Sequence, residues 1–159
     1  MTISSTRKLF LRHLLPATAL LLALMTAGCG SGNNNPTNVG LFGDWNIVMF
    51  PTGSSNAMYV FALAISQEGS NTYSGSPIPY TGSVPIPTNL CINSSDLRAS
   101  ATTTGNNFTL TITDATSATV ITVQGTLATN TSTLSGTYSN PASQTCGASS
   151  GTMSMTPQQ

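Results

Sequence analysis

Apolar residues alternate with threonine in the clearest segment of this sequence, and that period of two constrains the fold more than any other feature. From Phe108 to Thr113 the sequence reads FTLTIT, with Phe108, Leu110 and Ile112 on one face and threonines on the other. Such alternation is typical of a β-strand with one buried and one solvated face. Thr119–Leu127 repeats the theme, and no segment after residue 40 has an apolar stripe long enough for a helix. The sequence therefore predicts an all-β domain.

Other segments show weaker forms of this pattern, separated by glycine, proline and asparagine. The predicted strands are Asp44–Phe50, Ala57–Gln67, Thr72–Pro77, Leu97–Thr103, Phe108–Thr113, Thr119–Leu127, Thr133–Ser139 and Gly151–Thr156. Leu97–Thr103 is the least clearly marked, so the count is seven or eight. Even spacing and mostly short loops indicate a small antiparallel β-barrel or sandwich in residues 41–157. Gly75, Gly125 and Gly136 fall inside strands, where glycine fits a bulge or a bend of a curved barrel.

Two neighbouring segments depart from the simple alternation. Ala57–Ser66 is apolar on both faces, so we expect both faces to be covered or one of them to contact a partner. Pro77–Pro87 is proline-rich and cannot form an inner strand, because proline lacks a backbone N–H donor. We expect it to cross the surface as an extended loop. The alternatives are a lid over the mouth of a barrel or a docking strip for a partner.

Residues 1–28 are predicted to be a helical signal peptide. A positive patch at residues 7–12 precedes the apolar run Leu14–Met25, which is interrupted only by Pro16 and Thr18. Twelve helical residues rise about 18 Å, well short of the ~30 Å hydrocarbon core, so this run is not expected to span a membrane. A positive start, a short apolar core and small residues after it are typical of an export signal.

The signal ends in Thr-Ala-Gly-Cys at residues 26–29. Small residues before a cysteine resemble the lipobox of bacterial lipoproteins, although Thr26 stands where leucine is usual. The resemblance implies that Cys29 is acylated and becomes the N-terminus, and two acyl chains hold a protein stably on a membrane. An ordinary secretory signal would instead leave Cys29 as an incidental residue.

The resemblance to lipoproteins also carries a prediction of location. Gly30, not aspartate, follows the cysteine, which in that class implies sorting to the outer membrane, where the protein faces the periplasm or the outside. Residues 29–40 are then the lipidated cysteine and a flexible linker rich in glycine and asparagine, which reaches up to about 35 Å when stretched.

Charge is scarce and uneven. Charged residues make up 5% of the 159 residues, and most of the positive charge lies in the signal peptide. Residues 29–159 contain Arg98 as their only cation, four carboxylates, and neither lysine nor histidine. This composition excludes a nucleic-acid partner, which requires clustered cations. It also excludes Ser-His or Cys-His nucleophiles and histidine-ligated zinc or haem.

The four carboxylates, Asp44, Glu68, Asp96 and Asp114, show no catalytic pairing. Glu68 and Asp114 lie at predicted turns, where acids are common, and Asp96 is two residues from Arg98, as in a surface pair or loop contact. A glycosidase needs two carboxylates that face each other across a sugar. Calcium sites of the D-x-D-x-D type are absent from the sequence, although scattered Asp and Asn oxygens leave calcium open. We therefore expect no enzyme, no metal site and no cofactor.

Two cysteines, Cys91 and Cys146, follow Cys29. Because an exported protein passes through an oxidising compartment, this pair is predicted to form a disulfide bond. Closing a loop of about 55 residues would stabilise the fold by roughly 4 kcal/mol on the entropic model. The alternative is a free catalytic cysteine, but residues 29–159 offer no histidine or lysine to activate it.

Gly-Asp-Trp at residues 43–45 opens the first predicted strand, and Trp45 is the only tryptophan. This Gly-x-Trp resembles lipocalins and other calycins, whose eight-stranded barrel holds an apolar ligand at its open end while the tryptophan packs across the closed end. The chain departs from that pattern because Thr113-Asp114 lacks the following aromatic residue, and no arginine lies near the C-terminus. The alternative is that Trp45 is a core residue of an unrelated β-barrel or sandwich.

Two functions are consistent with these features. The first is binding of a small apolar or amphipathic molecule in the barrel, lined or plugged by Trp45, Tyr59, Phe61, Phe108 and Tyr138. The second is a structural or surface-interaction lipoprotein without a pocket, whose neutral Ser/Thr face and proline-rich segment contact an envelope protein or polymer. An eight-stranded barrel either fills with side chains or holds one small ligand, so the sequence leaves both open. With almost no charge to steer it, any partner is expected to bind by shape and hydrogen bonding.

Overall fold

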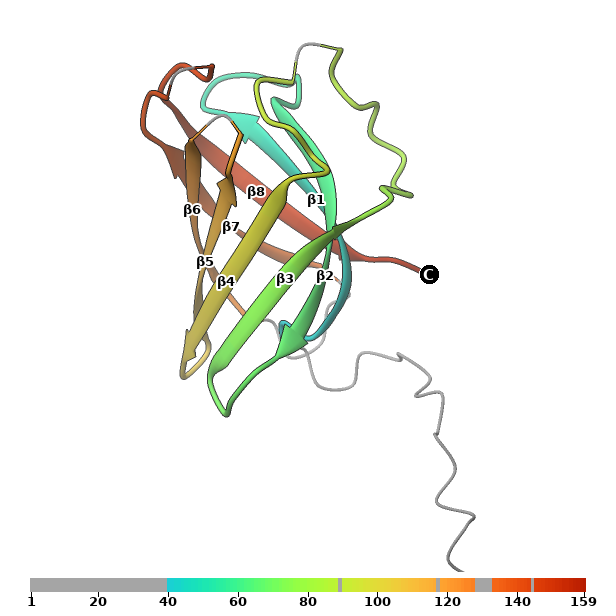
Figure 1. The fold of residues 1–159 in the computed structure, drawn as a ribbon, viewed down its shortest axis with the longest axis vertical. Helices are drawn as coiled ribbons and strands as arrows, with labels where there is room; N and C mark the ends of the chain where they lie inside the picture. The colour runs from blue at the N-terminus through green and yellow to red at the C-terminus, as the bar shows by residue number, and fades with distance from the viewer. Residues whose placement is uncertain (1–39, 89, 117, 128–132, 144) are drawn as a thin grey trace, which may run out of the picture. The chain divides into compact units, whose positions relative to one another are not determined.

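The computed structural model describes residues 40–159 except 89, 117, 128–132 and 144 (Figure 1). The predicted signal peptide and Cys29 lie outside these residues. Eight strands follow one another: β1 (Gly43–Pro51), β2 (Tyr59–Gln67), β3 (Thr72–Ile78), β4 (Leu97–Thr104), β5 (Asn107–Asp114), β6 (Thr119–Thr126), β7 (Leu134–Asn140) and β8 (Ser149–Pro157). The described part of the chain contains no helix that could cross a membrane.

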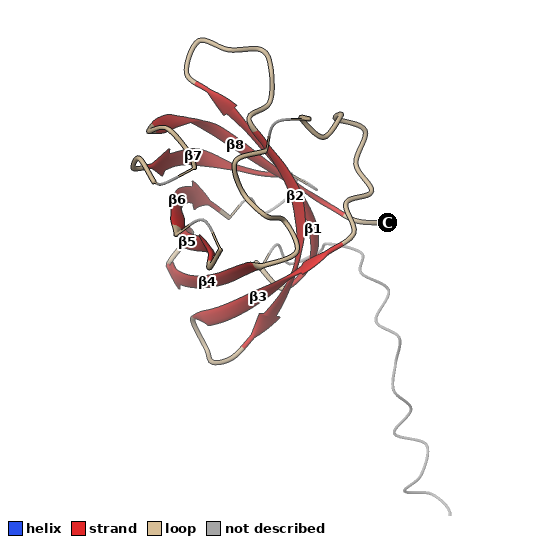
Figure 2. Cartoon of the chain, turned by 45° about the horizontal axis from the view of Figure 1, so that its top comes forward, coloured by secondary structure: helices blue, strands red, loops and turns tan. Residues whose placement is uncertain are grey.

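Each strand pairs antiparallel with the next, and β8 returns to pair with β1 from Pro157 opposite Trp45 to Gly151 opposite Pro51. The sheet therefore closes into an up-and-down barrel, which Figure 2 shows as one continuous curl of strands. The predicted all-β class is confirmed with eight strands, and the architecture is a barrel and not a sandwich. Even Leu97–Thr103, the least clearly marked segment, corresponds to a complete strand, β4.

The alternation in the sequence separates the interior from the exterior of the barrel. In β5, Phe108, Leu110 and Ile112 are buried, and the threonines between them face outward. Seven strands contribute buried side chains to one apolar cluster, and Tyr73 of β3 packs against it. A period of two makes each strand amphipathic, and closing the sheet brings all the apolar faces together.

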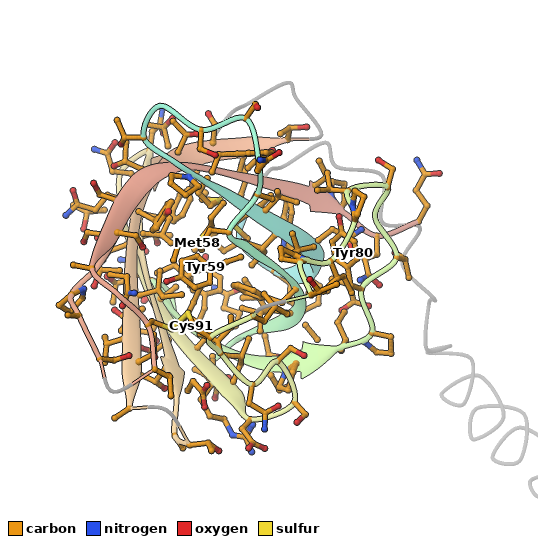
Figure 3. All side chains as sticks on the ribbon, turned by 90° about the horizontal axis from the view of Figure 1, so that it is seen from above. Met58, Tyr59, Tyr80 and Cys91 are labelled. Carbon is orange, nitrogen blue, oxygen red and sulfur yellow. A yellow bond between two sulfur atoms is a disulfide. The ribbon has the colours of Figure 1, made fainter. Side chains whose placement is uncertain are left out.

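β2 is buried on both of its faces, as its composition predicted. Val60 and Ala62 point outward, yet each is only 1% exposed. Residues 79–87, called the strap below, fold back over this part of the sheet, with Tyr80 between strap and barrel in Figure 3. The Thr81 backbone N–H donates to Asn46 Oδ1 at 3.1 Å, and Asn46 is the β1 residue opposite Ala62.

The C-terminus fastens the same strap. Gln158 Nε2 donates to Asn46 Oδ1 at 3.0 Å and to the Pro79 carbonyl oxygen at 2.9 Å. The proline-rich segment is therefore a surface loop along the side of the barrel and not a lid over its mouth. Its first residue, Pro77, belongs to β3, as the predicted strand Thr72–Pro77 had it, and β3 runs one residue further to Ile78. Both residues pair with β2 beyond the last β4 pair. A strand edge without a second partner tolerates proline's missing N–H.

The strand glycines make room for neighbouring groups instead of forming bulges. Gly125 and Gly136 lie opposite each other on β6 and β7, and the register passes through them without an extra residue. A methyl group on Gly125 would lie 2.5 Å from the Phe108 ring and 2.6 Å from the Ser135 carbonyl oxygen. The missing side chain lets the ring of Phe108 lie over the neighbouring strand. Of the two predicted roles, the register excludes the bulge at this pair and does not contradict a bend of the curved barrel.

This packing predicts that Gly125→Ala lowers the free energy of unfolding by about 1–3 kcal/mol, because the added methyl has no space in a packed barrel. Gly147→Ala is the matched control, since Gly147 lies in a loop with open space around the position of its Cβ. We expect that control to change the free energy by less than about 0.5 kcal/mol. Urea unfolding of both variants measures the difference. Equal stabilities would contradict the close approach at Gly125.

Candidate functional site

The two ends of the barrel are built differently. At one end, called the Trp45 end, the described chain begins, and Trp45 Nε1 donates to the Leu41 carbonyl oxygen at 2.8 Å. Leu41 is fully buried there. The opposite end, called the loop end, carries the connections at 52–58, 79–96, 115–118 and 141–148. Among the described residues, Leu41 and Trp45 cover the interior at the Trp45 end.

A disulfide bond closes the loop end. Cys91 and Cys146 are bonded as predicted, with their Cα atoms 5.2 Å apart, and they join the β3–β4 loop to the β7–β8 loop. Ile92 and Cys146 are buried as part of the apolar core. The Thr145 hydroxyl donates to the Cys91 carbonyl oxygen at 2.9 Å and ties the same two loops a second time. The described residues around the disulfide thus cover the barrel at the loop end. Cys91 follows the strap in the sequence.

The five aromatic residues predicted to line or plug the barrel are all inside it, and none is more than 4% exposed. Tyr59 and Tyr138 meet beneath the disulfide, with their rings edge to face and the centroids 5.8 Å apart. Phe61 and Phe108 lie in the apolar core between the two ends. Trp45 is at the opposite end of the barrel from the two tyrosines, so the five side chains do not form one pocket.

The described interior side chains are packed against one another. Met49, Tyr59, Leu63, Val123 and Met155 have 0% of their surface accessible. These five side chains are enclosed by protein atoms on all sides. In an eight-stranded barrel, side chains of this size are sufficient to fill the interior.

A polar network lies just beneath the disulfide, at the top of the apolar core. Asn140 Nδ2 donates to Tyr59 Oη at 2.8 Å and to the Gly147 carbonyl oxygen at 3.2 Å. Tyr59 Oη also lies 3.4 Å from the Ser149 hydroxyl. Within the described residues, Tyr138 Oη and Asn140 Oδ1 are buried without a hydrogen-bond partner. Sequence reasoning missed this network, because Asn140 and Ser149 look like ordinary loop residues.

Burial raises the pKa of the Tyr138 phenol above its ordinary value of 10.0. The nearby Ser149 hydroxyl lowers this pKa and Tyr59 raises it further, but both effects are smaller than that of burial. Ser149 does not meet hydrogen-bond geometry with Tyr138 Oη, so burial of an unpaired phenol is the cause that we take as decisive. The neutral phenol is therefore the form that the folded barrel favours.

The carboxylates hold loops in place. Asp114 is buried and accepts hydrogen bonds from the backbone N–H groups of Asn93, at 2.6 Å, and Thr116, at 2.9 Å. Asp96 accepts from Asn93 Nδ2 at 2.8 Å and from the Thr116 hydroxyl at 2.7 Å. The predicted contact of Asp96 is thus a loop contact, and Arg98 donates instead to the Leu97 carbonyl oxygen. No group of three or more metal-ligating side chains occurs among the residues that the structure describes.

The outer surface of β4–β8 is an array of small hydroxyl side chains, called the hydroxyl face below. Fifteen outward residues form three rows across five strands, and thirteen of them are serine or threonine. The rows are Ser100, Thr111, Thr122, Ser139 and Ser150; Thr102, Thr109, Gln124, Thr137 and Thr152; and Thr104, Asn107, Thr126, Ser135 and Ser154. The sequence predicted a neutral Ser/Thr face, but only the strand register shows that its residues align in rows.

Two surface grooves flank the strap. One, of about 460 Å³, lies between the strap and the β1–β2 loop and is lined by Phe50, Ala57, Val84 and Ile86, among others. The other, of about 320 Å³, lies where β3 and β4 separate, beside Pro77 and Ser95. Neither groove is lined by a charged side chain, and their polar lining residues are Ser94 and Ser95 in one and Ser55 and Asn56 in the other.

No family model, no curated protein and no solved structure matches this chain. The function must therefore be argued from the barrel itself.

The disulfide predicts a large stability effect. The double variant Cys91→Ala/Cys146→Ala should lose about 4 kcal/mol of unfolding free energy, because the bond closes 55 residues of chain in the unfolded state. Chemical denaturation with and without a reducing agent measures this loss. The reductant should lower the midpoint of the natural protein and leave the double variant unchanged. A midpoint that the reductant does not move in either protein would show that the bond is absent.

The tyrosine pair predicts opposite effects of one chemical change. Tyr138→Phe removes a buried hydroxyl without a partner, so it should leave stability unchanged or raise it by about 1 kcal/mol. Tyr59→Phe removes the acceptor of the Asn140 amide and should cost about 1–2 kcal/mol. Thermal unfolding at neutral pH compares them.

The raised pKa of Tyr138 adds a prediction about alkaline pH. The pKa of the Tyr138 phenol is higher in the folded than in the unfolded protein. The contribution of Tyr138 to stability is therefore complete below about pH 10 and is lost as pH rises through the folded-state pKa. Tyr138→Phe should therefore reduce the loss of stability above pH 10. An identical alkaline decline in the variant and the natural protein would contradict the assignment.

Proposed function

We propose that this protein is a lipid-anchored envelope protein that acts through the outer surface of a filled β-barrel, and not through a ligand held inside it. The observation that carries the proposal is the contrast between the two sides of the sheet. The described interior is packed with apolar side chains, whereas the exterior of five strands presents rows of serine and threonine hydroxyl groups.

The anchor in this proposal rests on the sequence. The positive N-terminus, the short apolar run and the lipobox-like residues 26–29 support acylation of Cys29, and Gly30 supports sorting to the outer membrane. The linker joins the barrel at the Trp45 end. The sides of the barrel and the loop end, with its disulfide, are then the parts that lie away from the point of attachment.

The lack of charge on the barrel supports a role in contact with a neutral partner. A small domain that only has to stay in solution ordinarily carries roughly 25–35% charged residues on its surface. Five charged residues are present in the whole of 40–159, and four of them are acids. A face without ions can meet an uncharged surface without the cost of removing charges from water. This is the situation of an interaction protein among neutral envelope components.

Binding of a small apolar molecule remains the second candidate. It is supported by the resemblance of residues 43–45 to calycins and by the unpaired Tyr138 Oη and Asn140 Oδ1 beneath the loops. Native mass spectrometry of the membrane-extracted protein separates the two candidates. We expect no small molecule that is released on denaturation. A released molecule of defined mass would contradict the filled barrel and establish a carrier.

The anchor itself predicts the behaviour of Cys29→Ala. The natural protein, expressed in its own host, should partition into the detergent phase with a mass that includes the acyl groups. Cys29→Ala should lack those groups, because no thiol remains to be acylated. The control is Cys91→Ala, which should keep the acyl groups since it lies outside the lipobox. A natural protein with unmodified Cys29, found in the aqueous phase, would overturn the anchor.

A further inference from the structure

We infer that the hydroxyl face of β4–β8 is a binding surface for an extended chain of a neutral polysaccharide. This inference rests on the proposed function and deepens it by naming the surface and the chemical class of the partner.

The spacing is regular because it is imposed by the strands. Neighbouring strands lie about 4.8 Å apart, and alternate residues on one strand repeat at about 6.7 Å. Thr102 and Thr109 are direct partners on β4 and β5, and Thr111 and Thr122 are direct partners on β5 and β6. The register runs without interruption from β4 through β8, so the same grid continues over five strands. A partner with a repeating pattern of hydroxyl groups can therefore make the same kind of contact at successive positions.

The hydroxyl groups at the centre of the grid are free to bond a partner. Thr102 and Thr109 are exposed, and Thr111 and Thr122 are half-buried. In the described part of the chain, none of these four hydroxyls makes a hydrogen bond, whereas Thr113 at the edge of the face donates to the Arg98 carbonyl oxygen. A threonine hydroxyl both donates and accepts, as a sugar hydroxyl does. The face and a sugar chain therefore carry the same kind of hydrogen-bonding group.

The absence of charge selects a neutral polymer. No row contains an acid or a base. Arg98 also points outward, but it lies opposite Thr113, outside the three rows, at the margin of the face nearest the loop end. Phosphate or carboxylate groups of an anionic polymer would find no cations to pair with, and they would lose water on contact. The acids that could attract a cationic polymer lie elsewhere, with Asp96 and Asp114 committed to loop hydrogen bonds. Neutral sugar hydroxyls need no charged partner and lose no charge hydration on contact.

The shape of the face favours a single polymer chain. Closing eight strands into a barrel curves the sheet, so a flat crystalline surface would touch only a few strands at once. A flexible chain can follow the curve across several rows. One hydrogen bond to a neutral group contributes little to binding in water, so a monosaccharide would bind weakly, and affinity requires many contacts along one chain.

Affinity gel electrophoresis of the full membrane-extracted protein in an uncharged, sugar-free detergent tests the inference. Gels would contain soluble β-glucan, α-glucan or mannan, with polygalacturonate as the anionic comparison and a polymer-free gel as the reference. We expect retardation by at least one neutral polymer and none by polygalacturonate. Free monosaccharide at the same mass concentration should not relieve the retardation, because it lacks the multiple contacts. The inference is overturned if the protein migrates in every neutral-polymer gel as it does in the polymer-free gel, or if the polyanion retards it more strongly than the neutral polymers do.

A pair of matched variants tests whether the hydroxyls are responsible. Thr102→Val/Thr109→Val keeps the branched shape and removes two adjacent hydroxyls. It should weaken binding and raise the dissociation constant about tenfold. Thr102→Ser/Thr109→Ser keeps the hydroxyls and should bind within about twofold of the natural protein. Thermal unfolding of both variants checks that the barrel is intact, since surface changes of this kind alter stability little. Full binding by the valine variant would overturn the role of the hydroxyls.

The outcomes also separate this inference from the proposed function. Failure of Cys29 to carry acyl groups would remove the anchor and leave the polysaccharide assay unaffected. A small molecule released in native mass spectrometry would remove the filled barrel and leave the Val/Ser comparison to decide on the outer face. Polysaccharide binding that fails while Cys29 is acylated and no molecule is released would overturn only the inference about the partner.

Discussion

The structure depends on the pairing of β8 with β1. Without that pair, β1 and β8 would each present a row of unpaired backbone donors and acceptors, and one edge of the apolar interior would be open to water. With the pair, every strand has two neighbours and every second side chain points into one enclosed space. Gly151 fits this closure, because its partner Pro51 and the Phe50 carbonyl oxygen leave no space for a side chain there.

Because the barrel is closed, the residues on the inner and outer sides of the sheet meet different requirements. The inward residues have to fill a narrow space, which explains why Gly125 yields its side-chain volume to Phe108. At the ends, where the strands stop, the backbone needs other cover: Leu41 and Trp45 provide it at one end, and the disulfide-linked loops provide it at the other. Tyr138 Oη and Asn140 Oδ1, which are buried without a partner among the described residues, lie just below that second cover, where the apolar core meets the loops.

The outward residues are released from the demands of packing, and here they carry almost no charge. The strap shows that part of this exterior is already used within the chain, because it covers the apolar outer face of β2 through Asn46 and Gln158. The strands on the other side, β4–β8, have no such cover among the described residues. Their ordered and neutral hydroxyls are the feature from which both the proposed function and the proposed partner are argued.

The sequence by itself determined the strand positions, the all-β class and the pairing of Cys91 with Cys146. These follow from local periodicity, from turn residues and from the even number of cysteines left after Cys29, all of which are readable one segment at a time. The interior position of Trp45, Tyr59, Phe61, Phe108 and Tyr138 was also predictable, because large apolar faces have to be buried. Only the tertiary structure decided between a barrel and a sandwich, buried Tyr138 Oη and Asn140 Oδ1 without a hydrogen-bond partner among the described residues, and aligned Thr102 with Thr109 across strands. Those properties depend on register and closure, which are relations between distant segments and leave no local pattern in the sequence.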